Sequence, residues 1–110
     1  MTTEVTFRHF KSKHPHLHDM ALEAADGFTQ FNGSILSTHV EFINEPEEKV
    51  VKFTVNANGK VLVSNDKTDD FKKSLAGAED KLIRQLRKLK TKQQDHDHER
   101  FEPETDKPEY

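Results

Sequence analysis

DDFKKSLAGAEDKLIRQLRKLK, residues 69–90, has the clearest helical period in the chain. Spacings of three and four residues place its large apolar side chains on one stripe, formed by Phe71, Leu75, Ala78, Leu82, Leu86 and Leu89. Asp69 and Asp70 precede this stripe and suit the positive end of a helix dipole. The segment therefore predicts an amphipathic helix that packs one face against a core.

Basic side chains cover the rest of this helix. At about 100° per residue, the cations on the arc away from the apolar stripe are Lys73, Lys81, Arg84, Arg87, Lys88 and Lys92. The negative end of the dipole accounts for Lys90 and Lys92, but not for the cations further back. Two interpretations remain, a solvated face and a face that binds a polyanion. Clustered like charge is typical of nucleic-acid surfaces, so we favour the second.

Gly77 interrupts the helix one turn before Lys81. A glycine inside a helix costs about 1 kcal/mol relative to alanine, so Gly77→Ala is expected to raise the melting temperature. Close approach of an RNA backbone is the functional hypothesis for Gly77. Drift at a tolerant surface site is the alternative.

The preceding residues alternate with a period of two or recur with a helical period. Val5 and Phe7 share one face of a first predicted strand, and Pro15 suits the first turn of a helix. Asn58-Gly59 is typical of a hairpin turn. The predicted elements are a strand over 4–10, a helix over 15–31, and strands over 35–43, 49–55 and 60–64.

This order, β-α-β-β-β-α, predicts an α+β fold. Its form is one mostly antiparallel four-stranded sheet with two helices packed on one face. In the strand over 35–43, the expected core face carries Leu36, Thr38, Val40 and Phe42. The opposite face of the sheet is expected to remain wet, with Ser37, His39, Lys52 and Thr54 on it.

Charge divides the chain in two. Residues 1–92 carry 15 Lys or Arg and 13 Asp or Glu, whereas residues 93–110 carry 2 and 7. We predict a domain over 1–92 and a disordered acidic tail over 93–110. There is no cysteine and no apolar run of the length that a signal peptide or a membrane span needs. The expectation is a cytoplasmic protein without membrane contact.

Catalytic and metal sites have little support. His14, His16 and His18 alternate at a loop-helix junction, where they point in different directions, so we interpret them as surface histidines. No nucleophile elbow, phosphate-binding glycine loop or paired carboxylate is visible. We expect no enzyme activity, no catalytic residue, no metal, no cofactor and no small-molecule substrate.

The run LVSNDKTDDFKKSLAGAEDKLIRQLRKLK, residues 62–90, resembles the ribosome hibernation-promoting factors and ribosome-associated inhibitors in their short form. Those proteins share a strand, an Asp-rich turn and a helix of the form D-K-L-x-R-Q-L-x-K-x-K. The resemblance implies binding to the decoding region of the small ribosomal subunit, inhibition of translation during stress, and a monomer away from the ribosome. It also implies rRNA contacts from Lys81, Arg84, Arg87, Lys88 and Lys90.

The full predicted RNA-binding set is Arg8, Lys11, Lys13, Lys73, Lys81, Arg84, Arg87, Lys88, Lys90 and Lys92. The first helix departs from the family, whose members carry several cations there. From His16 to Phe31 this chain has none, and Asp19, Glu23 and Asp26 make the helix acidic. The alternative hypothesis is therefore a protein-interaction domain whose acidic first helix and tail bind a basic partner.

Overall fold

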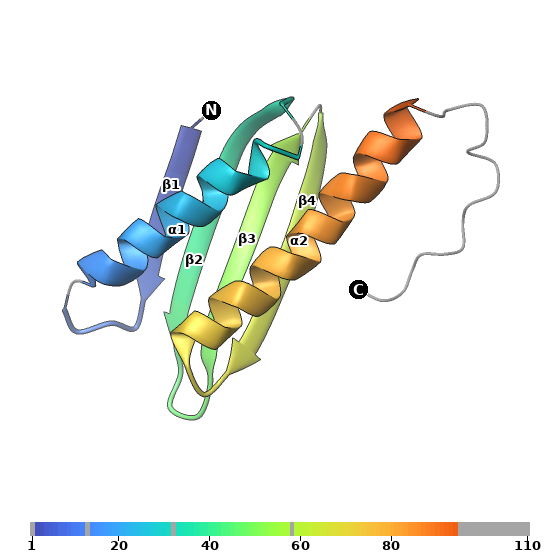
Figure 1. The fold of residues 1–110 in the computed structure, drawn as a ribbon. Coiled ribbons are helices and arrows are strands. Elements are labelled where there is room, and N and C mark those ends of the chain that lie inside the picture. Colours follow the sequence, from blue (N-terminus) through green and yellow to red (C-terminus); the bar gives the residue numbers. More distant parts are fainter. Residues whose placement is uncertain (1, 13, 32, 58, 95–110) are drawn as a thin grey trace.

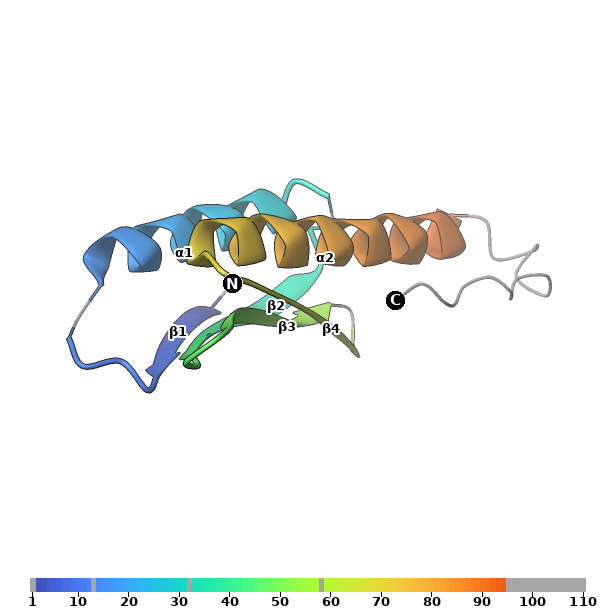
Figure 2. The same cartoon turned by 90° about the horizontal axis from the view of Figure 1, so that it is seen from below.

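The computed structural model describes residues 2–12, 14–31, 33–57 and 59–94. Its elements are β1 (Thr2–Arg8), α1 (Pro15–Phe28), β2 (Ile35–Asn44), β3 (Lys49–Ala57), β4 (Lys60–Thr68) and α2 (Phe71–Gln94). The strands form one sheet in the order β1-β2-β3-β4, with β1 parallel to β2 and the other neighbours antiparallel. Both helices lie on the same face of this sheet (Figures 1 and 2). The predicted α+β architecture is confirmed.

The core fills the space between the helix layer and the sheet. Phe28 of α1 meets Phe53 of β3 edge to face, with ring centroids 5.1 Å apart. The large side chains with less than 2% exposure come from both layers: Phe28, Val40, Phe42, Val51, Phe53, Val55, Leu82 and Leu86. Burial of each such side chain stabilises the fold by about 1.5–3 kcal/mol. The predicted apolar stripe of α2 therefore packs as expected.

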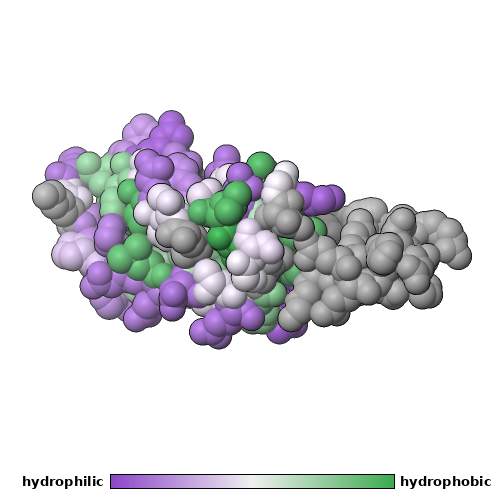
Figure 3. Space-filling model, turned by 90° about the horizontal axis from the view of Figure 1, so that it is seen from above, coloured by the Kyte–Doolittle hydropathy of each residue, from purple (hydrophilic) through white to green (hydrophobic). Residues whose placement is uncertain are grey.

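The first residues of β2 differ from the prediction. Ile35 pairs with Ala57 and Ser37 pairs with Asn56, so Leu36 is an extra residue in a β-bulge. As a result Ile35 is buried and Leu36 is 62% exposed, although Leu36 was expected on the core face. Apolar side chains reach the surface among polar ones at this end of the molecule (Figure 3).

The ends of β1 and α1 also differ from the prediction, for local reasons. The first strand ends at Arg8 instead of residue 10, because His9 has a φ of 65°, which breaks the extended backbone. Helix α1 ends at Phe28 and not at residue 31. The next three amide groups bond to carbonyls three residues back, which closes the helix in a tighter turn.

β4 is longer than predicted. Its polar second half continues to Thr68, which pairs with Lys49 of β3. The hairpin at Asn58-Gly59 is confirmed, since Ala57 pairs with Lys60 and Gly59 has a φ of 80°. The register then places Asp66 and Thr68 on the side of the sheet that faces α2, next to the buried Ser64.

Among the residues that the structure describes, no helix covers the other face of the sheet. Ser37, His39, Lys52 and Thr54 lie on it as predicted, each half-buried by its neighbours. There the hydroxyl of Thr6 lies 2.8 Å from Nε2 of His39.

Candidate nucleic-acid interface

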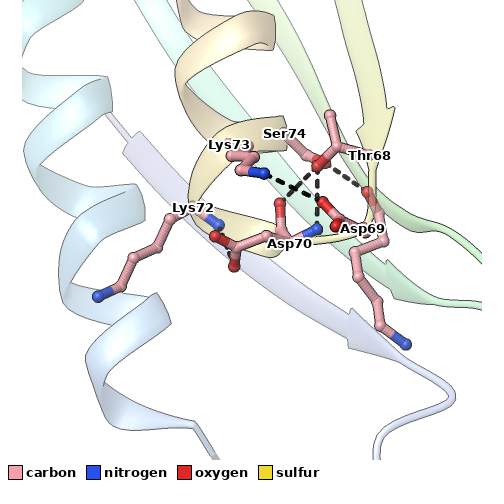
Figure 4. Close-up of polar contacts among 7 residues, drawn as sticks. Thr68, Asp69, Asp70, Lys72, Lys73 and Ser74 are labelled. Atoms are coloured by element: carbon pink, nitrogen blue, oxygen red, sulfur yellow. Dashed lines mark hydrogen bonds and ion pairs between the residues drawn. The ribbon is translucent and has the colours of Figure 1, made fainter.

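The start of α2 is anchored to the sheet by a polar network around Thr68 (Figure 4). The hydroxyl of Thr68 accepts the amide of Asp70 at 3.0 Å and lies 2.8 Å from the hydroxyl of Ser74. Ser74 is fully buried and donates to the carbonyl of Lys49 on β3. Asp70 accepts the amide of Lys72 at 3.3 Å, which satisfies one of the donors at the helix N-terminus. This network fixes where the basic helix begins.

From this anchor, α2 presents a ridge of cations to solvent, which we call the α2 ridge. The side chains of the α2 ridge are exposed and lie away from the buried leucines: Lys73, Arg84, Arg87 and Lys88. The C-terminal turns of α2 run past the β4 side of the sheet (Figures 1 and 2). A large partner can therefore approach this part of the helix without meeting the strands.

Two cations of the α2 ridge pair with acids close to them in sequence. Arg84 lies 2.8 Å from Asp80, and Lys73 lies 3.4 Å from Asp69. Such exposed pairs contribute about 0–1 kcal/mol, so a phosphate can replace the carboxylate at little cost. Both acids nevertheless lower the positive potential of the ridge.

Arg87 lies on the side of α2 that faces α1. Its guanidinium carbon is 5.3 Å from the centroid of the Phe31 ring, at the end of the first helical segment. A cation–π contact of this kind holds the planar guanidinium in one orientation. A guanidinium group can also bind a phosphate through two parallel N–H groups, so Arg87 is a candidate phosphate contact.

Lys81 turns away from the ridge toward the edge strand. Its ammonium group donates to the carbonyl of Asn65 at 3.0 Å and lies 3.5 Å from the carboxylate of Asp66. One turn later, the amide of Gln85 donates to the carbonyl of Val63 at 2.8 Å. Lys81 and Gln85 thus satisfy outward carbonyls of β4 that an edge strand leaves unpaired. Part of the charge of Lys81 is used inside the fold.

The structure gives a reason for the glycine at position 77 that the sequence pattern did not reveal. A Cβ atom built at Gly77 would lie 2.7 Å from Cγ of Asp66, and its carboxylate oxygen Oδ2 would be closer still. The close approach that the structure shows at Gly77 is that of a β4 side chain. The expected gain from Gly77→Ala is therefore opposed by a cost, because alanine would displace the carboxylate that pairs with Lys81. The sequence offered one signal for this close approach, which was a glycine in the middle of the helix four residues before a lysine.

The remaining predicted cations do not join the α2 ridge. Arg8, at the end of β1, lies on the helix-free face and pairs with Glu41 of β2 at 3.1 Å. Lys11 is exposed in the β1–α1 connection. Lys13 and the side chains of Lys90 and Lys92 lie outside the described part of the chain. Lys73, Arg84, Arg87 and Lys88 therefore share the solvent-facing side of α2, with Lys81 on the β4 flank.

The neighbouring helix has the opposite charge. Asp19, Glu23 and Asp26 of α1 are exposed and spaced by four and three residues, so they share one face. α1 lies beside α2 in the same layer (Figure 2). The helix layer therefore has a basic half on α2 and an acidic half on α1, and only the basic half attracts a polyanion.

Glu79 lies on the α2 flank next to the buried stripe and is half-buried. Its burial raises the pKa of the carboxyl group above the usual value, and the adjacent charge of Asp80 raises it further. The charged form of the Glu79 carboxylate therefore lowers the stability of the folded state at neutral pH.

Other kinds of site are not formed by the described residues. Within residues 2–12, 14–31, 33–57 and 59–94, no group of three His, Asp or Glu side chains could hold a metal ion. His14 and His18 instead line a small cavity beside β1, which His16 does not. In the same part of the chain, no helix is both long and apolar enough to cross a membrane.

Comparison with solved structures gives the same fold at low sequence identity. A ribosomal subunit interface protein from Coxiella burnetii superimposes with a TM-score of 0.71 at 21% identity, over 83% of this chain and 99% of that chain. The N-terminal domain of Thermus thermophilus Protein Y superimposes with a TM-score of 0.70 at 13% identity, over 78% of this chain and 94% of that chain. At these identities the likeness shows the fold alone.

The sequence itself carries the family assignment. No curated protein matches the chain. The family model described as Sigma 54 modulation protein / S30EA ribosomal protein matches residues 3–94, which is nearly the whole described region. The resemblance drawn from residues 62–90 is confirmed, and this chain belongs to the Sigma 54 modulation protein / S30EA ribosomal protein family of ribosome-associated hibernation factors.

Proposed function

We propose that this protein binds the rRNA of the small ribosomal subunit near the decoding region and inhibits translation there by occupying space. The family is one of ribosome-associated factors, which makes the ribosome the partner and the cytoplasm the place of action. The α2 ridge carries the proposal. It is exposed, cationic and anchored at both flanks, which suits contact with RNA phosphates.

The proposed mechanism needs no chemical step. Lys73, Arg84, Arg87 and Lys88 would neutralise phosphates, while the leucine stripe behind them keeps the helix rigid against the sheet. Contacts to phosphate position a protein without reading sequence, which suits a factor that recognises the shape of one RNA surface. Bound in this way, the folded domain would exclude tRNA and mRNA.

The direct test is reversal of charge on the α2 ridge. Arg84→Glu combined with Lys88→Glu should abolish cosedimentation with ribosomes, since both side chains are exposed and point away from the core. A matched control is Lys52→Glu combined with Lys67→Glu. This pair makes the same charge change on the helix-free face, where Lys67 pairs with Glu48.

The two double variants separate local contact from overall charge. Loss of binding in the first and retention in the second supports the α2 ridge as the rRNA contact. Equal loss in both variants means that net charge alone drives the association. Undiminished binding of the Arg84/Lys88 variant, with an unchanged melting temperature, would falsify the proposal. Chemical footprinting of the small-subunit rRNA then locates the site.

A further inference from the structure

A second surface lies beside the first turn of α1. A cavity of about 400 Å³ opens between β1 and the first turn of α1, and it does not touch α2. The described residues that line it are Phe7, His14, Pro15, His18 and Asp19. Two of the histidines that the sequence pattern left without a role thus contribute to one concave site.

The walls of this cavity are aromatic and held in place. Phe7 stacks on Phe42 with centroids 5.1 Å apart and an interplanar angle of 9°. Phe10 packs edge-on against Phe7 at 5.1 Å and against His14 at 4.8 Å. Because Phe42 is fully buried, the rings that form the floor have little freedom to move. The Phe7 wall of the cavity is therefore held in place.

The cavity is acidic on its α1 side. Asp19 lines the opening, and Glu23 and Asp26 continue from it along the exposed face of α1. Between His16 and Phe31 the chain contains no Lys or Arg, and the nearest preceding cations in the sequence are Lys11 and Lys13. The exposed face of α1 therefore repels a phosphate backbone and attracts a positively charged partner.

An arginine side chain matches both properties. Its guanidinium group is favoured over aromatic faces and forms paired hydrogen bonds with a carboxylate, and its aliphatic stem packs on apolar surface. We propose that this cavity is a docking site for an arginine side chain of a basic polypeptide segment that lies along α1. The protein would then use α2 for RNA and α1 for protein.

This inference does not rest on the proposed rRNA contact, because the two surfaces share no residue. A ribosome offers basic polypeptide segments as well as RNA, so both surfaces can be used together. Binding at the cavity can also be measured without ribosomes. A negative result for the cavity therefore does not affect the proposed role of the α2 ridge. A negative result for the α2 ridge does not affect the cavity either.

The test is an NMR titration of the full chain with a capped nine-residue peptide of alternating arginine and glycine. The matched probe replaces every arginine by citrulline, which keeps the shape and removes the charge. We expect saturable shifts at Phe7, His14, His18 and Asp19 with the arginine peptide and none with the citrulline peptide. Asp19→Asn should weaken binding about tenfold, the size expected for a hydrogen bond to a charged group.

Asp26→Asn is the control variant, since it removes the same charge about 10 Å further along α1. It should weaken binding no more than about twofold, as expected for an exposed charge. Equal losses for Asp19→Asn and Asp26→Asn would show diffuse attraction to α1 and overturn the docking site. Absence of saturation at millimolar peptide would overturn it too. A heptauridylate that shifts the cavity residues when the peptide does not would identify a nucleobase site instead, which also contradicts the proposal.

Discussion

Asp66 on β4 and Gly77 on α2 fit together because the glycine has no side chain. The carboxylate of Asp66 occupies the space beside the helix backbone that a Cβ at position 77 would take. From there it pairs with the ammonium of Lys81, one turn further along. Strand and helix are thus joined on the β4 flank of α2, between Lys73 and Arg84 of the α2 ridge.

Gly77→Ala should stabilise the protein only when the carboxylate of Asp66 is removed. In an Asp66→Ala background, the substitution should raise the free energy of unfolding by about 1 kcal/mol, the helix propensity difference. In the unaltered chain the gain should be cancelled or reversed, because alanine displaces Asp66. Denaturant unfolding of the four proteins measures this coupling. Equal gains in both backgrounds would show that the two residues do not interact.

Substitutions of Lys81 and Lys88 should differ in whether they affect stability or ribosome binding. Lys81→Met should lower the free energy of unfolding by about 0.5–1.5 kcal/mol, because a hydrogen bond to Asn65 and a partly buried pair with Asp66 are lost. Lys88→Met should lower it less than Lys81→Met does, because the side chain of Lys88 is exposed whereas that of Lys81 is half-buried. Ribosome cosedimentation should show the opposite order, with Lys88→Met the weaker binder. The same order in both measurements would contradict this division of roles.

Removal of the carboxylate at Asp80 should strengthen binding to RNA. Asp80→Asn releases Arg84 from a 2.8 Å pair and takes one negative charge from the α2 ridge. Affinity should rise about two- to fivefold at low salt, and this gain should shrink as added salt screens the charges. Glu45→Gln, on the β2–β3 turn, makes the same charge change away from α2 and should leave affinity unaltered. A gain of equal size in both variants would mean that the effect is one of net charge.

Glu79 should make stability depend on pH in a defined direction. Burial and the charge of Asp80 raise its pKa in the folded state. Between the ordinary carboxyl pKa and this raised pKa, the folded protein therefore binds more protons than the unfolded chain. Stability contributed by this group therefore falls as pH rises through the raised pKa, and the cost is fully present above it. Glu79→Gln should raise the melting temperature at pH 7 and lose this advantage below the ordinary carboxyl pKa. A gain that persists undiminished at low pH would point to packing instead of charge.

The affinity of the α2 ridge for ribosomes should fall steeply with salt. Each phosphate that a cation neutralises adds about 0.9 to the slope of log affinity against log salt. Arg87→Gln should therefore flatten the slope by about one unit, and Arg8→Gln on the helix-free face should leave it unchanged. Sedimentation at a series of salt concentrations gives both slopes. Identical slopes for the two variants would show that Arg87 does not contact phosphate.

Much of this protein follows from short-range patterns in the sequence. The spacing of Phe71, Leu75, Leu82 and Leu86 determines which face of α2 is buried, because a helix turns by a constant angle per residue. Alternation does the same for β3, and Asn58-Gly59 marks the hairpin. The fold class could be predicted from these features, and the family from the resemblance carried by residues 62–90.

The errors occur where a neighbour in space overrides the local pattern. Leu36 follows the alternation of its strand but is turned to solvent by a bulge. The polar run after Ser64 looks like a loop, yet pairing with β3 makes it a strand through Thr68. Tertiary pairing decides such cases, because extended backbone has weak intrinsic preferences.

The sequence by itself determined the order of the elements, the buried stripe of α2 and the opposite charges of the two helices. Only the tertiary structure decided how the cations are used. It turned Lys81 to the edge of β4, placed Arg8 on the far face beside Glu41, and set Asp66 against Gly77. The physical reason is that periodicity specifies which face of an element is buried. Strand order and register decide which residues lie beside the flanks of an element. Both arise only when distant segments pack together.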